Sequence, residues 1–352
     1  MDNKKLTVVI GAGASRELGL PTGAELKSTI SSLLDITFER GLRQQSGDSQ
    51  IYEALRLHVQ DSENQREGIN PYLYAGWRIR DAMPQAISID NFIDTHQGDA
   101  KIELCGKLAI VKSILDAERK SLLFIDPNSS KNKINFTRTD ATWVNPFFRI
   151  VTENCRATEL QSRLSKITLI VFNYDRCIEH YLYWSIQNYY GVGAQEAADL
   201  VNTMDIYHPY GTVGRLPWQN ESSNVGFGAE LGPTQLLSIA RQIKTFTEGT
   251  DPDSSEIAEI RNATSTSARL LFLGFAFHKL NMELLCSKVQ LPSPDQYKRI
   301  FATAMGISRN DSEEIANDLA TLGNCPTSRV QVRTDLVCHA VFSEYARGLS
   351  LL

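Results

Sequence analysis

The sequence lacks the features that would assign it to a membrane or nucleic-acid-binding class. Lys and Arg number 36 and Asp and Glu number 41, so no basic excess exists to neutralise phosphates. No apolar run approaches the roughly 18 residues of a membrane-spanning helix. The apolar stretch near the N-terminus is too short for a signal peptide. We therefore expect a cytoplasmic protein without membrane contact or direct nucleic-acid binding.

Metal-binding motifs are also missing. The chain of 352 residues has 6 cysteines and 6 histidines, all scattered. The cysteines are Cys105, Cys155, Cys177, Cys286, Cys325 and Cys338. No two of them show a CxxC spacing, and the histidines form no HxxxH or HExxH motif. This distribution predicts reduced, buried thiols and no zinc or other metal site.

Short apolar runs recur along the chain and alternate with segments of helical periodicity. The runs that we expect to be strands cover residues 6–10, 167–172, 204–207, 270–273, 299–303 and 330–333. Their alternation with helices predicts an α/β fold built on a doubly wound, mainly parallel, Rossmann-like sheet.

The stretch between the first two expected strands shows no strong strand signal. Residues 24–165 are predicted to form a large helical insertion, and residues 1–23 and 166–352 the Rossmann-like domain. Further helices are expected at 177–190, 235–247, 311–322 and 337–349. Asp311 is the expected N-cap of the third of these, because Glu314 follows at capping-box spacing.

The first expected strand runs directly into the turn Gly11-Ala12-Gly13-Ala14-Ser15. Such a turn lets the backbone approach a pyrophosphate, and the following amides can donate to it. A dehydrogenase fingerprint needs a third small residue where Arg16 stands, and an acidic residue about 20 positions further on. The turn therefore favours nucleotide binding without hydride transfer, with a plain tight turn as the alternative.

Polar residues follow the next two expected strands. Asn173 and Asp175 come directly after residues 167–172, and His208 follows residues 204–207. An asparagine both donates and accepts, so Asn173 is suited to orient a ribose hydroxyl or a water. Asp175 is suited to bind a sugar hydroxyl or to cap the next helix. His208 is a candidate general base, with a structural histidine as the alternative.

Two further segments contribute candidate residues. Gly274 ends an expected strand and would admit a ligand closely, and Phe275 would pack on an adenine or fill the core. Asp90 lies in the expected insertion, where it would cap a helix or reach into the cleft.

The motifs GAGAS with GLPTG, SIDNF, VFNYD, HPYG and LGFAF occur in the order found in bacterial sirtuin-like NAD hydrolases. The chain resembles this family over roughly residues 5–349. The family degrades NAD in antiphage defence, and its members often work with a partner or sensor such as a HerA-type ATPase.

The resemblance implies a role for each matching residue, with NAD as substrate and no further cofactor. It makes Asn173 and His208 the catalytic pair. The implied NAD contacts are Gly11, Ala12, Gly13, Ser15, Pro21, Thr22, Asp90, Asp175, Gly274 and Phe275.

The chain departs from true sirtuins in ways that bear on its reaction. It lacks their zinc-binding cysteine pairs, carries GLPTG in place of their GAGIS-to-DFR loop, and has Phe172 where they carry glutamine. These departures count against lysine deacylation. The hypotheses are an NAD hydrolase, an NAD-dependent protein deacylase, and a non-catalytic sensor of NAD or ADP-ribose. Because unrestrained NAD loss is toxic, we expect a homo-oligomer or a regulatory partner to restrain a hydrolase.

Overall fold

The computed structural model describes residues 5–40, 43–61, 68–128, 133–219, 224–244, 254–286 and 297–351. The chain divides into two compact units. The first unit comprises residues 1–19, 122–209 and 250–352. The second comprises residues 20–121 and 210–249.

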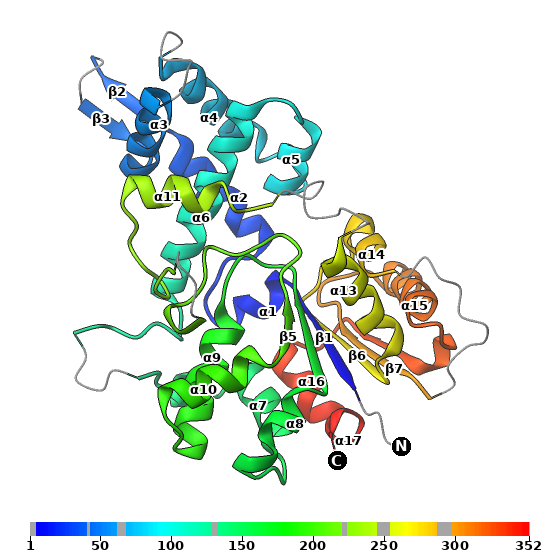
Figure 1. Cartoon of the computed structure of the whole chain (residues 1–352). Coiled ribbons are helices and arrows are strands. Elements are labelled where there is room, and N and C mark those ends of the chain that lie inside the picture. The colour runs from blue at the N-terminus through cyan, green and yellow to red at the C-terminus, as the bar shows by residue number, and fades with distance from the viewer. Residues whose placement is uncertain are drawn as a thin grey trace. The chain divides into compact units, whose positions relative to one another are not determined.

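The core of the first unit is a six-stranded sheet in the order β5-β4-β1-β6-β7-β8 (Figure 1). Every neighbouring pair is parallel. The strands are β1 (Leu6–Ile10), β4 (Ile167–Val171), β5 (Asp205–Tyr207), β6 (Arg269–Leu273), β7 (Arg299–Thr303) and β8 (Val330–Arg333). All the strands expected in this sheet are confirmed, with ends that shift by at most one residue.

The strand order is that of a doubly wound fold. The chain starts at β1, moves outward through β4 to β5, then returns to β6 and moves outward to β8. Its direction therefore reverses between β1 and β6, where open α/β sheets place their ligands. Every residue of β1 and β4 is buried, because helices cover both faces of the central strands.

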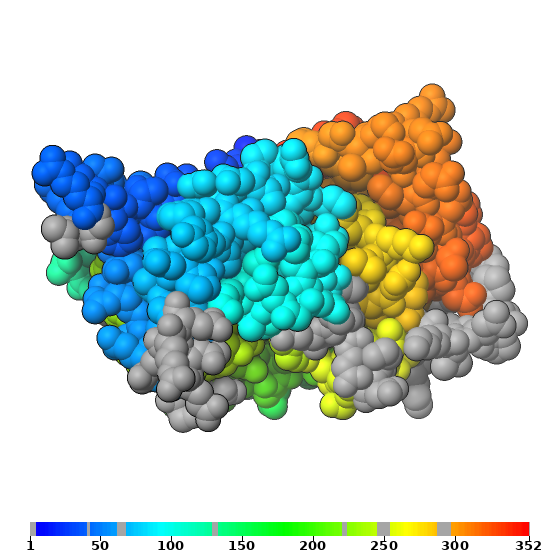
Figure 2. Space-filling model, turned by 90° about the horizontal axis from the view of Figure 1, so that it is seen from above, coloured from blue at the N-terminus to red at the C-terminus, as the bar shows by residue number. Residues whose placement is uncertain are grey.

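Most helices of the first unit fall into two groups by contact, on either side of the strands (Figure 1). One group contains α7 (Val144–Thr152), α8 (Leu160–Leu164), α9 (Cys177–Tyr190), α10 (Ala194–Asn202), α16 (Cys338–Glu344) and α17 (Ala346–Leu349). The other contains α13 (Ser255–Thr266), α14 (Lys279–Leu285) and α15 (Arg309–Gly323). Helix α13 contacts both α14 and α15, and Figure 2 shows the yellow part of the chain, to which α13 and α14 belong, beside α15 in orange.

The start of α15 corrects one expectation. Its N-cap is Ser308, whose hydroxyl accepts a hydrogen bond from the Asp311 amide at 3.1 Å. The predicted Asp311 cap is wrong, because the chain is already helical from Arg309. Asp311 lies in the first turn instead, where a carboxylate favours the positive end of the helix dipole.

The second unit is mainly helical. Its elements are α2 (Gly23–Leu34), β2 (Thr37–Glu39), β3 (Arg43–Ser46), α3 (Ser49–Asp61), α4 (Asn70–Ala82), α5 (Ile89–Thr95), α6 (Ala100–Lys120) and α11 (Pro233–Ala240). The long α6 contacts each of the other helices in that series. The antiparallel hairpin β2–β3 was not expected, because its strands are short and largely polar, and none of their residues is buried. Helix α11 ends before the predicted 247, and residues 245–247 lie outside the described part.

The units divide the chain differently from the expected insertion at 24–165. Residues 122–165 belong to the sheet unit, where α7 contacts α9 and α16. The rings of Phe147 on α7 and Phe342 on α16 pack edge to face. Residues 210–249 belong to the helical unit, where α11 contacts α3 and α6.

Candidate functional site

Five polar side chains meet beside the carboxyl ends of β1, β4 and β5, and we name them the strand-end cluster. The cluster consists of Ser15, Asn173, Asp175, Glu179 and His208. Ser15 lies on α1 (Ala12–Arg16) after β1, Asn173 and Asp175 follow β4, Glu179 lies on α9, and His208 follows β5. Parallel strands end at one edge of a sheet, which brings together residues far apart in sequence.

A chain of hydrogen bonds joins three members of the cluster. Asn173 Nδ2 donates to Ser15 Oγ at 2.8 Å, and Ser15 Oγ donates to Asp175 Oδ2 at 2.7 Å. Asp175 Oδ1 accepts from the Cys177 amide at 3.1 Å in the first turn of α9. All three side chains are buried. Asp175 therefore accepts from the first amide of α9 and also fixes the Ser15 hydroxyl, but the N-cap position expected of it is occupied by Arg176.

The other half of the cluster is a contact between His208 and Glu179. His208 Nε2 lies 2.6 Å from Glu179 Oε1, and His208 Nδ1 lies 3.2 Å from the Asn173 carbonyl oxygen. Burial alone would lower the pKa of His208, but the charge and hydrogen bond of Glu179 raise this pKa above its ordinary value. Burial would raise the pKa of Glu179, but the charge and hydrogen bond of His208 lower it. The cluster thus pairs a buried imidazole with a buried carboxylate, and each group favours the charged form of the other.

The glycines after β1 and β6 are explained by the close approach of two loops. The Gly11 amide donates to the Leu273 carbonyl at 2.9 Å, and the Gly13 amide donates to the Gly274 carbonyl at 3.0 Å. A Cβ on Gly11 would lie 2.5 Å from the Gly274 oxygen. The amides of Gly11 and Gly13 are therefore engaged within the protein. Any phosphate at this turn would have to use other donors, such as those around Ala12 and Ser15.

Phe275 packs in an aromatic cluster. Its ring centroid lies 4.9 Å from that of Phe172 and 5.2 Å from that of Phe277, both in edge-to-face geometry. Phe275 is buried. These contacts support its reading as a core residue. Phe277 has a φ of 53°, which is strained for a bulky side chain and marks this loop as conformationally constrained.

The remaining sequence candidates, Pro21, Thr22 and Asp90, belong to the second unit. Thr22 is the N-cap of α2 and forms a capping box with Glu25. Helix α5 is capped by Ser88, whose hydroxyl accepts from the Asn91 amide at 3.0 Å. Asp90 lies in the first turn of that helix, so the cap expected of it is supplied two residues earlier.

The capping box gives a direct test of the structural role of Thr22. Thr22→Ala should lower the free energy of unfolding of the helical unit by about 1 kcal/mol, because the helix loses its side-chain cap. Thr22→Ser is the matched control, since serine keeps the hydroxyl that accepts from Glu25. Urea denaturation of both variants gives the comparison. Equal unfolding midpoints for alanine and serine would contradict the capping role.

Sequence reasoning missed two carboxylates of the sheet unit. Glu179 lies four residues after Asp175, a spacing that puts both at the start of one helix and was the available signal. Glu17 accepts from the Trp143 amide at 2.8 Å and from the His339 amide at 3.1 Å, which ties the starts of α7 and α16 to the β1 loop. Neither contact has a sequence motif.

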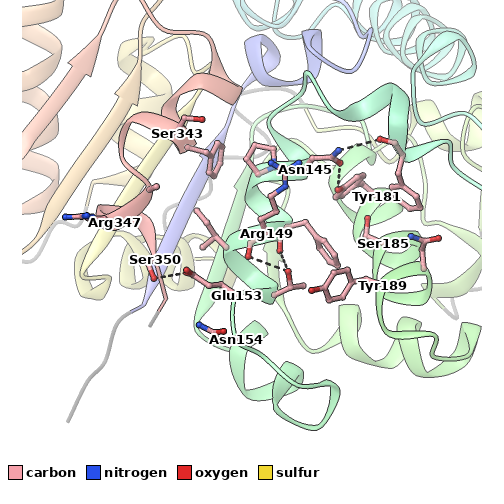
Figure 3. Close-up of a pocket in the computed structure, with 18 residues that line it drawn as sticks. Asn145, Arg149, Glu153, Asn154, Tyr181, Ser185, Tyr189, Ser343, Arg347 and Ser350 are labelled. Carbon is pink, nitrogen blue, oxygen red and sulfur yellow. Dashed lines mark hydrogen bonds between the residues drawn. The ribbon is translucent and has the colours of Figure 1, made fainter.

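A separate cavity of about 950 Å³ lies among α7, α9, α16 and α17 (Figure 3). It contains no residue of the strand-end cluster. Tyr181 donates to Asn145 Oδ1 at 2.6 Å, and Ser350 donates to Glu153 Oε2 at 3.0 Å. These polar groups connect neighbouring helices, and Figure 3 shows Arg347 directed away from the other labelled side chains.

No protein-family model matches the chain, and no curated protein is a significant match. Across the described residues, no group of three or more His, Cys, Asp and Glu side chains is arranged to hold a metal ion. None of the helices in the same residues is long and apolar enough to cross a membrane. A functional assignment therefore depends on the chemistry of the strand-end cluster and on the order of the sequence motifs.

Proposed function

We propose that this chain is a cytoplasmic NAD hydrolase that yields ADP-ribose and nicotinamide, and that it depletes NAD in antiphage defence. The observation that carries the proposal is the hydrogen bond between His208 Nδ1 and the Asn173 carbonyl oxygen. The two residues follow the adjacent strands β4 and β5. The chain reversal beside β1 lies next to them, where doubly wound sheets bind nucleotides. The motif order that resembles sirtuin-like NAD hydrolases supports the same reaction.

Asn173 has the hydrogen bonds that a ribose-orienting residue needs. Its Nδ2 is committed to Ser15, which fixes the orientation of the amide. No hydrogen bond joins its Oδ1 to a residue of the described ranges. That oxygen is a positioned acceptor for a ribose hydroxyl or for the attacking water.

The chemistry requires one bond to break and one to form. The bond from ribose C1′ to the nicotinamide nitrogen breaks, and its electron pair neutralises the pyridinium ring, so the leaving group needs no strong acid. The ribose develops oxocarbenium character, and a water oxygen bonds to C1′ and loses a proton. His208 is the proposed base for this proton, a role worth about 10²–10⁴ in rate.

An incubation with NAD and no acceptor separates this function from the alternatives. A hydrolase releases nicotinamide and ADP-ribose in equal amounts. An NAD-dependent deacylase releases nicotinamide only when an acylated peptide is supplied. A sensor binds NAD or ADP-ribose and leaves NAD intact. The absence of nicotinamide in every sample that contains folded chain and candidate partners would refute the hydrolase.

We further propose that the purified chain forms a homo-oligomer and is weakly active or silent alone, with a HerA-type ATPase as a candidate partner. The reason is that constant NAD loss would kill the host cell. Light scattering followed by an NAD assay tests both parts. A monomer that hydrolyses NAD at full rate without a partner would contradict this prediction and leave the proposed site standing.

A further inference from the structure

We infer that Glu179 is a positioning residue that holds His208 as a doubly protonated cation, so that the pair must separate before His208 accepts a proton. The inference concerns the charge state of two residues. Only its consequence for catalysis rests on the proposed function.

The two contacts of the imidazole ring carry the inference. Nε2 faces a carboxylate oxygen at 2.6 Å and Nδ1 faces a backbone carbonyl oxygen at 3.2 Å. At these positions a carbonyl only accepts, and an ionised carboxylate only accepts. Both ring nitrogens must therefore carry a hydrogen when Glu179 is ionised. A ring with two hydrogens has no lone pair to act as a base.

The surroundings of the pair favour this charged form. The side chains of His208 and Glu179 are only 9% and 5% exposed, so water competes little for either group. Asp175 adds a second negative charge that acts on His208, and the positive charge of the buried Arg176 acts on Glu179. With His208 protonated, the negative charges of Glu179 and Asp175 are balanced by the positive charges of His208 and Arg176. The geometry and these charges agree with the raised pKa of His208.

Glu179 keeps one unused acceptor. Its Oε2 is buried and has no hydrogen-bond partner in the described parts of the chain. When His208 loses its Nε2 proton, a nitrogen lone pair and Oε1 face each other and repel. Once the ring turns away from Oε1, the Nε2 lone pair can accept the proton of the attacking water, while Glu179 can accept from a water or hydroxyl in its place. The reactive form therefore gains population as pH rises through the raised pKa of His208.

Nitrogen-detected NMR of ¹⁵N-histidine in the full chain tests the charge state without any need for catalysis. His208 is assigned as the signal that is lost in His208→Gln. We expect both ring nitrogens of His208 to remain protonated at pH 7 in the wild type. In Glu179→Gln, which removes the charge at nearly constant size, we expect a neutral ring at pH 7. The matched control is Glu196→Gln on the exposed side of α10, which should leave the His208 signal unchanged. A neutral His208 at pH 7 in the wild type would overturn the inference.

The pH profile of NAD hydrolysis gives the catalytic readout. Glu179→Gln should move the acid limb of kcat/KM to lower pH, with about tenfold more activity on that limb per pKa unit. A merely structural Glu179 would lower activity at every pH and leave the limb in place, which would contradict the positioning role. If no sample hydrolyses NAD while NMR shows that His208 is doubly protonated, the proposed function is refuted and the inferred charge state of His208 is upheld.

Discussion

Asn173→Ala and His208→Ala should each slow NAD consumption by about 10²–10⁴-fold, which corresponds to roughly 3–5 kcal/mol of activation barrier. The Asn173→Ala substitution removes both the Oδ1 acceptor and the Nδ2 group that donates to Ser15. The His208→Ala substitution removes the only imidazole of the strand-end cluster. The measurement is nicotinamide release under conditions in which the wild type is active.

Two further variants make this result interpretable. His208→Ala leaves Glu179 buried without its counter-charge, which by itself destabilises a protein by about 3–5 kcal/mol. His208→Gln removes the base but keeps an amide donor for Glu179, and it should be inactive and folded. Asn202→Ala, at the exposed end of α10, is the control for asparagine substitution and should retain full activity. Wild-type rates in both Asn173→Ala and His208→Gln would end the proposal for this site.

Gly274→Ala should cost roughly 2–5 kcal/mol of stability, or prevent folding, because two penalties combine. Gly274 has a φ of 55°, a conformation unfavourable for alanine. A Cβ there would also overlap the Gly13 and Ala14 backbone, which belongs to α1 directly after β1. The segments that follow β1 and β6 would therefore have to move apart.

Gly191→Ala is the matched control for this prediction. Gly191 ends α9 with a φ of 69°, and a Cβ there would meet no atom within 4 Å. It carries the conformational penalty alone, about 1–2 kcal/mol. Urea denaturation of both variants compares the two costs. Equal losses at the two positions would show that the loop contact at Gly274 contributes nothing.

The central strands of the sheet were predictable because they are mainly apolar runs that end close to glycine or polar residues. Leu6–Ile10 and Ile167–Val171 are the clearest cases, since burial on both faces requires such runs. The hairpin of Thr37–Glu39 and Arg43–Ser46 was missed for the opposite reason, as its strands bury little and show no apolar alternation.

The candidate site was predictable only in part. Asn173, Asp175 and His208 were found because polar residues at strand ends are a sequence signal. Glu179, the partner of His208, was not found, because its sequence position is that of an ordinary acidic residue in the first turn of a helix. The glycine turn was predicted to receive a phosphate, but its Gly11 and Gly13 amides donate to the carbonyls of Leu273, at the end of β6, and Gly274. Contacts between loops distant in sequence have no local pattern.

The most direct test of the central claim is nicotinamide release from NAD, followed with and without candidate partners. It compares the wild type with the double variant Asn173→Ala/His208→Gln, purified identically and shown to be folded. The account predicts that the wild type, alone or with its partner, releases nicotinamide and ADP-ribose in equal amounts, and that the double variant releases neither. Equal release by the two proteins, or no release by the wild type in any combination, would contradict it.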